Sequence, residues 1–332
     1  MPGSTVPDLT RHATALATVM SRAPSLHNAQ PWRLRVTTDT VELHADRGRH
    51  LPVADPDGRQ LHLGLGAALL ALRLAVADLR GDARVELLPD PDQPDLAARL
   101  YIVGHRDPTA TESALLAAIA SRRTVRTPFT AREIPVPLRV ALGEHALAEG
   151  ARLRWVETPG ERHGVAALVT VAEHRQLADP AYRAELANWT SSSTLAAGAG
   201  VPPTSYGVTA GAGHAAPFPL RDFAGGREVV PPRPADAMED HPVIAALCTD
   251  GDRPADWLTG GQALLRVLLA ATTAGLASSQ LNQPIEIPAL RGQLRDELRL
   301  DAWPQLLLRL GHPAGPLPPP TPRQPVTDIL LP

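Results

Sequence analysis

The amino-acid sequence predicts an α+β fold, a sandwich of helices and strands in two similar halves related by an approximate two-fold axis. Three observations support this prediction. Two segments, 65–79 and 263–274, are almost entirely apolar, which is typical of helices buried on all sides. Amphipathic helical segments and strand-like segments flank both of them. The two apolar segments also resemble each other in sequence, so we expect them to be the central helices of the two halves.

The other elements are predicted from the spacing of apolar residues. The three-and-four spacing of an amphipathic helix occurs in Leu9–Ser21, Ser113–Arg122 and Pro137–Ala148. Short apolar runs predict strands at Trp32–Thr37, Val41–Ala45, Arg99–Val103, Leu153–Glu157 and Leu306–Leu310.

The two apolar helices carry an internal repeat. Residues 66–75 read GAALLALRLA and residues 261–270 read GQALLRVLLA. Each copy is preceded by a helix, a turn and a strand, and each is followed by an apolar strand that ends in glycine. Helices rich in alanine and leucine look alike by composition alone, but the agreement in element order favours a duplication. We therefore expect residues 1–104 and 105–332 to form an intrachain pseudo-dimer.

A stretch rich in Ser, Gly, Ala and Pro runs from about residue 188 to residue 234 without sustained periodicity. A run of this length inside a compact protein is either disordered or a functional lid. Four aromatic residues favour an ordered lid insertion at about 190–234, and they are Trp189, Tyr206, Phe218 and Phe223. The glycines at 198–200 and 211–213 are expected to make this cover segment flexible.

Composition excludes several classes of function. The net charge of −3 lacks the basic surplus that binding to nucleic acid requires. All 32 basic residues are arginine, which excludes Schiff-base chemistry on lysine and leaves arginine, histidine or backbone N–H groups to bind phosphate. The 12 histidines show no HxxxH or HExxH pairing, so the sequence supports no metal site.

The sequence also favours a soluble, cytoplasmic protein with no membrane partner. Cys248 is the only cysteine, so no internal disulfide can form. The first ten residues lack the charged and apolar regions of a signal peptide. No segment reaches the run of roughly 20 uninterrupted apolar residues that a membrane span requires.

Three polar segments could carry chemistry, and the first is Arg122-Arg123-Thr124-Val125-Arg126. If the preceding helix continued, Arg122 and Arg126 would lie on the same side of it. Thr124 adds a hydroxyl donor between them. Arginine makes paired hydrogen bonds to phosphate oxygens, so this segment is a candidate phosphate clamp. The alternative is a solvated basic patch on the surface.

The second segment, 23–32, reads APSLHNAQPW. Four of its residues offer neutral donors and acceptors to a polar ligand edge, namely Ser25, His27, Asn28 and Gln30. The alternative is an ordinary loop, and for Trp32 we prefer a role as a core anchor. The third segment, 275–284, reads GLASSQLNQP and directly follows a buried helix. Its buried backbone N–H groups need partners, which a planar heterocycle could supply.

These three segments, in this order, resemble the nitroreductase-like flavoproteins, and the chain resembles their single-chain, pseudo-dimeric Acg-type branch over roughly residues 9–326. The resemblance implies a nitroreductase-like fold and FMN as cofactor. The family's phosphate-binding motif falls on Arg122, Arg123, Thr124 and Arg126. Its loop PSxxNxQPW, which reaches the flavin from the opposite half, supplies Pro24, Ser25, Leu26 and Asn28. The segment along the isoalloxazine ring, where a backbone N–H can reach N5, falls on Gln280, Leu281 and Asn282. A late basic residue that helps to hold the phosphate corresponds to Arg323.

The resemblance implies an FMN-dependent oxidoreductase that transfers electrons or hydride through flavin N5. The phosphate motif and the loop each occur once, so we expect one FMN per chain. The substrate would be a quinone, a nitro compound or a small metabolite, and NAD(P)H is a candidate donor that a closed lid would hinder. The alternatives are a non-catalytic FMN-binding or FMN-storage protein and a helical binding module without cofactor.

Some details of the site stay open at this point. The family often places a basic residue near flavin N1/O2, for which Arg175 is the candidate, with a solvated helix surface as its alternative. No catalytic acid or base can be identified from the sequence. Because the pseudo-dimer removes the need for a partner, we expect a monomer or a weak dimer.

Overall fold

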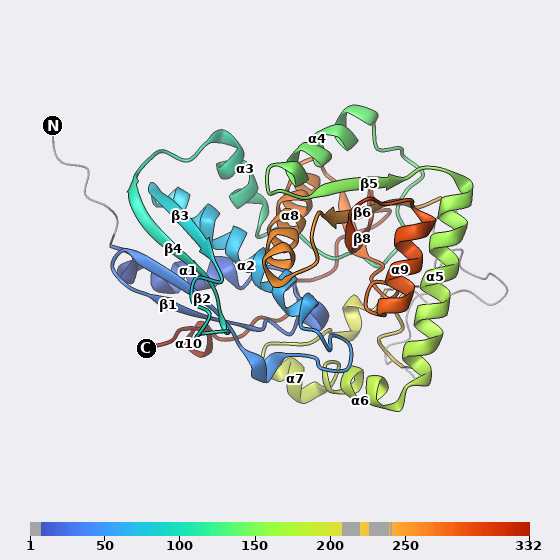
Figure 1. Ribbon diagram of the computed structural model, residues 1–332, viewed down its shortest axis with the longest axis horizontal. Coiled ribbons are helices and arrows are strands. Elements are labelled where there is room, and N and C mark those ends of the chain that lie inside the picture. Colours follow the sequence, from blue (N-terminus) through green and yellow to red (C-terminus); the bar gives the residue numbers. More distant parts are fainter. Residues whose placement is uncertain (1–7, 208–219, 226–238, 240) are drawn as a thin grey trace.

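The computed structural model describes residues 8–207, 220–225, 239 and 241–332, and it contains two four-stranded antiparallel sheets (Figure 1). The first sheet has the order β1-β2-β4-β3, with β1 at Trp32–Val36, β2 at Thr40–Ala45, β3 at Gly81–Leu87 and β4 at Leu96–His105. The second has the order β5-β6-β8-β7, with β5 at Arg152–Val156, β6 at Val243–Thr249, β7 at Ala277–Gln280 and β8 at Trp303–Gly311. The two sheets therefore share one topology, and the prediction of an α+β fold with two similar halves is confirmed.

Along the chain, a long helix separates β2 from β3 in the first half and β6 from β7 in the second half. These helices are α2 (Arg59–Asp78) and α8 (Pro254–Thr273), and both are buried along most of their length. They contain the predicted repeat and pack against each other at the centre of the protein (Figure 1). By length and hydropathy α2 could cross a membrane, but 94% of its most apolar stretch is buried inside the protein, which is the position of a core helix.

Two glycines allow the central helices to touch backbone to backbone. A Cβ added to Gly66 would overlap the carbonyl oxygen of Leu258, and a Cβ added to Gly261 would overlap the carbonyl oxygen of Leu63. In each case the glycine meets the carbonyl three residues before the other glycine. The repeat therefore fixes the point at which the two halves cross.

The outer helices cover the central pair. The first is α1 (Ala13–Met20), preceded by a 3-10 turn at Leu9–His12, and it packs on α2. In the second half α4 (Val136–Leu147) packs on α8 in the same way, and α3 (Ala110–Ala118) contacts both central helices. The predicted helix at Ser113–Arg122 therefore ends earlier than expected. The sequence analysis did not predict β3, β6 or β7. As a result, the strand that directly follows each central helix is β3 or β7, and the strands expected there, β4 and β8, come next.

The second half carries a long insertion between β5 and β6. It contains α5 (Pro159–Ala178), α6 (Pro180–Asn188), α7 (Ser192–Ala196) and a 3-10 turn at Pro203–Ser205. In the first half, only three residues join β1 to β2. Figure 1 shows α5, α6 and α7 following one path from the second sheet back towards the first half. The predicted cover segment lies within this insertion, and Phe218 and residues 211–213 fall outside the described residues.

Two glycines of the cover segment have a structural role that differs from the expected flexibility. Gly198 and Gly200 have φ angles of +77° and +78°, which side chains other than glycine rarely adopt. An added Cβ would overlap the backbone of Arg323 and of Trp189, respectively. Both glycines are needed for close packing: Gly198 packs the cover segment on the C-terminal tail, and Gly200 packs it on the end of α6.

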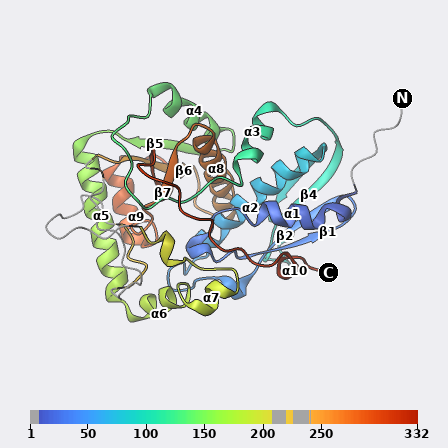
Figure 2. The same ribbon diagram turned by 180° about the vertical axis from the view of Figure 1, so that it is seen from behind.

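The C-terminal tail returns to the first half. After β8 it continues to α10 (Val326–Ile329), which packs on α1 and β1. The Leu331 N–H donates to the carbonyl oxygen of Leu34 at 2.8 Å. Figure 2 shows this tail crossing from the second sheet to the first. The middle of the tail, residues 318–323, therefore lies at the junction between the halves.

Candidate functional site

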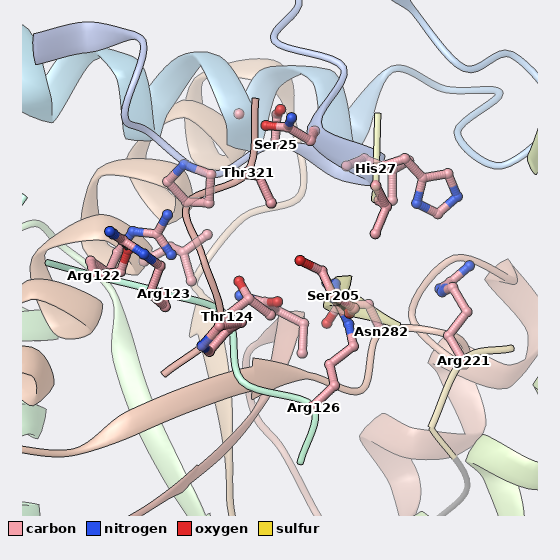
Figure 3. Close-up of a pocket in the computed structure, with 18 of the residues that line it drawn as sticks. Ser25, His27, Arg122, Arg123, Thr124, Arg126, Ser205, Arg221, Asn282 and Thr321 are labelled. Carbon is pink, nitrogen blue, oxygen red and sulfur yellow. Dashed lines mark hydrogen bonds between the residues drawn. The ribbon is translucent and has the colours of Figure 1, made fainter. Parts of the chain in front are cut away.

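A pocket of about 1280 Å³, its open mouth included, lies where both halves, the cover segment and the C-terminal tail meet (Figure 3). All of the predicted cofactor-binding residues except Leu281 line this pocket. They are Pro24, Ser25, Leu26, Asn28, Arg122, Arg123, Thr124, Arg126, Gln280, Asn282 and Arg323. The loop and the arginine motif, about 100 residues apart in sequence, therefore share one cavity.

Leu281 does not face the pocket. Its side chain is fully buried in a hydrophobic cluster with Ile285 and Leu307. Its backbone N–H donates to the carbonyl oxygen of Leu307 at 2.9 Å. The second sheet therefore satisfies the Leu281 N–H, and of the three residues expected along the ring only Gln280 and Asn282 line the pocket.

Four guanidinium groups gather at one end of the pocket, and we call them the arginine cluster. Its members are Arg22, Arg122, Arg123 and Arg323. No carboxylate of the described residues lies within 4.0 Å of any of them. Burial and the neighbouring arginines lower the pKa of Arg122 to about 10 and that of Arg323 to about 9. Like charges buried without counter-ions are unfavourable, and an anion would relieve them.

Several nitrogen atoms of this cluster lack a hydrogen-bond acceptor within the described residues. They are Nε and Nη1 of Arg122 and Nε of Arg323, and all are buried. Thr124 and Thr321 add hydroxyl groups to the same wall, and Thr321 Oγ1 accepts from Arg323 Nη1 at 2.6 Å. Buried donors of this kind need acceptors, which phosphate oxygens provide.

The segment that carries the predicted phosphate motif is extended rather than helical. Thr124 forms a parallel bridge with Ser278, and the Val125 N–H donates to the Ser278 carbonyl oxygen at 2.8 Å. The fully buried Arg309 donates to the carbonyl oxygens of Val125 and Thr127. These contacts with the second sheet draw the chain out of the helix after α3.

As a result, Arg122 and Arg126 do not lie on the same side, and that expectation is wrong. Figure 3 shows Arg122 and Arg123 at one end of the cavity and Arg126 towards the other. Arg126 Nη1 donates to the carbonyl oxygen of Ser205 at 2.8 Å. Burial and the charge of Arg221 lower the pKa of Arg126 to about 10.

The polar side chains of the PSxxNxQPW loop bind protein more than they face the cavity. Asn28 Nδ2 donates to the carbonyl oxygens of Gly200 and Pro322, both at 3.0 Å, and its Oδ1 accepts from Arg323 Nη1 at 2.6 Å. Gln30 Nε2 donates to the Gly198 carbonyl oxygen at 2.9 Å. The loop therefore ties the cover segment and the tail together, and Asn28 positions Arg323.

Two other residues of this loop, Trp32 and His27, are buried. Trp32 is fully buried, as predicted for a core anchor. His27 lines the pocket with a buried Nε2 that has no hydrogen-bond partner among the described residues.

The end of the pocket away from the arginine cluster contains residues that the sequence analysis missed. Arg221 and Phe223 come from the cover segment, and Glu286 follows the QLNQP segment. Arg221 Nη2 donates to both carboxylate oxygens of Glu286, at 2.7 and 2.8 Å, and Arg221 also contacts the Tyr182 hydroxyl. The one signal in the sequence is a single acidic residue in the apolar run Pro284–Pro288.

Arg175, the candidate for a basic residue near the flavin ring, does not reach the pocket. It is exposed on the outer face of α5, and the alternative of a solvated helix surface is correct. The neighbouring Gln176 faces inwards instead, and its Nε2 donates to Glu286 at 2.7 Å.

The corresponding position in the other half is closed. Thr259 occupies in α8 the position that Gly64 occupies in α2, and it packs against Gly150 of a shorter loop. Beside it the buried Glu149 accepts from Arg73 at 2.5 Å and from Arg266 at 2.9 Å. The second half therefore has packed side chains and ion pairs at the position that Gly64 occupies beside Ser25 in the first half.

Comparison with known proteins gives relatives along almost the whole chain. No family model matches. The chain is 35% identical, over 98% of its length and 92% of the relative's, to a Mycobacterium tuberculosis protein with the provisional name NAD(P)H nitroreductase Rv3131. It is 33% identical to a protein of the same organism with the provisional name NAD(P)H nitroreductase acg, over 97% of this chain and 95% of that one.

Solved structures give partial matches. A nitroreductase with bound FMN from Desulfitobacterium hafniense has a TM-score of 0.38 and 15% identity, covering 63% of this chain and 94% of that one. The NADPH:FMN oxidoreductase of Vibrio harveyi, complexed with NAD+, has a TM-score of 0.36 and 14% identity, covering 62% and 72%.

Proposed function

The chain belongs to the family of NAD(P)H nitroreductase-like proteins that includes Acg, and from this premise we propose that it is an oxidoreductase that binds one FMN in the pocket between its halves. The arginine cluster carries this proposal. A phosphate monoester bears nearly two negative charges at neutral pH, and the cluster supplies four guanidinium groups without a carboxylate partner in the described part of the chain. The buried N–H groups of Arg122 and Arg323 would bind its oxygens.

The middle of the pocket suits a flat ring with polar edges. Leu63, Leu264 and Leu306 give it an apolar wall, and Gly64 leaves space beside Ser25. Gln280 and Asn282 place polar groups at the end of the second sheet. A largely apolar cavity with a few fixed polar groups is the usual form of a cofactor site. When bound, FMN supplies electron transfer through its N5 position.

The cover segment supports water exclusion from this site. Val201, Ser205 and Phe223 line the pocket from the cover side. Gly207, with a φ of +88°, packs so closely on Arg126 that an added Cβ would overlap its backbone. A cover held at such contacts also favours the second candidate function, in which the protein stores FMN without turnover.

A donor titration separates the two functions. We expect the FMN-loaded protein to lose its absorbance at about 450 nm when NADH or NADPH is added without oxygen, and to regain it with a quinone or nitro compound. Dithionite serves as the control, because it shows that the bound flavin is reducible. If dithionite bleaches the flavin and neither nucleotide does, the oxidoreductase proposal fails and storage is favoured.

Asn28 gives a further prediction, because it positions an arginine without exposing its own polar atoms. Asn28→Ala removes the acceptor of Arg323 Nη1, so the FMN dissociation constant should rise about tenfold, the usual cost of losing a hydrogen bond to a charged group. Quenching of FMN fluorescence on binding measures this. Asn188→Ala, at an exposed asparagine of α6, is the matched control. Equal affinity in the two variants would contradict the positioning role.

A further inference from the structure

One outer helix of the second half exposes a stripe of large apolar side chains. On α4, Val136 is 70% exposed, Val140 56% and Leu147 60%. They are three of the seven large hydrophobic side chains that are exposed among the described residues. Intervals of four and seven residues place them on one face of the helix, and Gly143 lies between them without a side chain of its own. Figures 1 and 2 both show α4 at the periphery of the molecule.

Neither the fold nor helix formation requires this stripe. The helix α1 has the same place in the first half, and its exposed positions include Thr14, Ala15 and Thr18. Valine is a weaker helix former than alanine, because its branched side chain loses rotamer freedom in a helix. A contiguous apolar patch on a protein surface marks a contact with another molecule. We propose that α4 is the interface of a reversible homodimer, in which two copies of this helix pack side by side and point in the same direction.

The charges beside the stripe match a second copy in this orientation. Arg139 borders the stripe on one flank and Glu144 on the other, and within the described part of the chain neither has an ion-pair partner within 4.0 Å. In a parallel pair of helices, a side chain on one flank meets the residue five positions later on the opposite flank of the partner. Each Arg139 would therefore face Glu144 of the second copy.

The opposite orientation is disfavoured by the same two residues. In an antiparallel pair each flank meets its own counterpart, which brings arginine towards arginine and glutamate towards glutamate. Like charges at such distances repel each other. The charges therefore select the parallel pair, which has a two-fold axis and so forms a closed dimer.

The arginine is already held in place for this contact. Arg139 Nε donates to the Ile134 carbonyl oxygen at 3.0 Å, and the guanidinium carbon lies 5.7 Å from the centre of the Trp155 ring. Its two terminal nitrogens make no hydrogen bond within the described residues, which leaves them for a carboxylate. A contact made by one helix of 12 residues is smaller than the roughly 800 Å² per partner of a standard interface, so the dimer should dissociate on dilution.

Sedimentation velocity of the purified full chain tests the dimer. Over a hundredfold range of concentration, monomer should give way to dimer as the concentration rises. Val140→Glu buries a charge against the partner and should raise the dissociation constant at least about tenfold. Val103→Glu is the matched control, because Val103 is 61% exposed on β4 and lies outside the stripe, so the dissociation constant should not change. Circular dichroism shows whether each variant keeps its fold.

A charge exchange tests the orientation of the two helices. Glu144→Arg alone should weaken the dimer several-fold, because arginine then meets arginine at both flanks. Adding Arg139→Glu should restore the original dissociation constant, which a merely structural role of either residue would not do. The proposal is overturned if the exchange restores nothing, or if Val140→Glu and Val103→Glu have the same effect. A chain that stays monomeric at every concentration also overturns it, and a different molecule would then cover the stripe.

Discussion

The variant that combines Arg122→Gln with Arg323→Gln is expected to bind FMN at least 100-fold more weakly and to have a higher Tm without cofactor. The loss of affinity follows from removing two charged donors, each worth about 1.5–3 kcal/mol in a hydrogen bond to a charged group. FMN affinity can be measured by fluorescence quenching, and the Tm of the cofactor-free protein by calorimetry.

The gain in stability follows from the sign of the pKa changes. In the folded protein, burial and mutual repulsion lower the pKa of Arg122 to about 10 and of Arg323 to about 9, whereas the unfolded chain keeps the ordinary high values. The unfolded state therefore binds protons more strongly, and the charged groups destabilise the fold at all pH values below about 9. Neutral glutamine removes this cost, which we expect to raise the Tm by on the order of 2 °C.

An exposed arginine provides the control for this variant. Arg84 pairs with Glu86 on the surface, and its side chain is 69% exposed. Arg84→Gln should change neither FMN affinity nor Tm, since exposed ion pairs contribute little. If the double variant lost FMN and also lost stability, the cluster would be a structural element and the phosphate assignment would be contradicted.

The second large effect is expected where the central helices cross. Gly261→Ala places a methyl group on the backbone carbonyl of Leu63, and Gly66→Ala does the same at Leu258. Neither carbonyl can move without separating α2 from α8. We expect each change to lower the free energy of unfolding by more than about 3 kcal/mol, beyond the usual cost of overpacking because the obstacle is backbone.

The matched control is another helical glycine with free space around it. Gly143 lies inside α4, and a Cβ added there meets nothing within 4 Å. Gly143→Ala should stabilise the protein by about 0.5–1 kcal/mol, because alanine is the better helix former. Thermal or urea unfolding measures all three variants. A small effect at both crossing glycines would show that the halves can separate without loss of stability.

The sequence predicted the parts of the fold that have a strong local signal. The two central helices are apolar on every side and repeat one another, so both their burial and the two-fold arrangement could be recognised. The loop at 24–32 and the arginine motif were placed correctly in one pocket. Strand β7, with the sequence ASSQ, has neither alternation nor a continuous apolar run and could not be recognised. Strand β3, with the sequence GDARVEL, does alternate apolar and polar residues, and the sequence analysis missed this signal.

Long-range contacts explain most of the errors at the site. The direction of Arg126 depends on the bridge between Thr124 and Ser278, which no local pattern shows. Asn28 suits a ligand contact by its chemistry, but the tail and the cover segment take all of its polar atoms. Arg221 enters the pocket from a stretch without periodicity, so only the folded chain reveals it.

The insertion between β5 and β6 has a consequence for how such a protein evolves. In an assembly of two identical subunits one gene encodes both copies, so an insertion that covers one cavity would also cover the other. In this chain the two halves are encoded separately. Three residues connect β1 to β2 in the first half, whereas a long insertion connects β5 to β6 in the second. The two halves can therefore diverge, as they do where Thr259 and Glu149 pack in one half and Gly64 lines the pocket in the other. The two sheets keep the same strand order, whereas the connections between their strands differ in length.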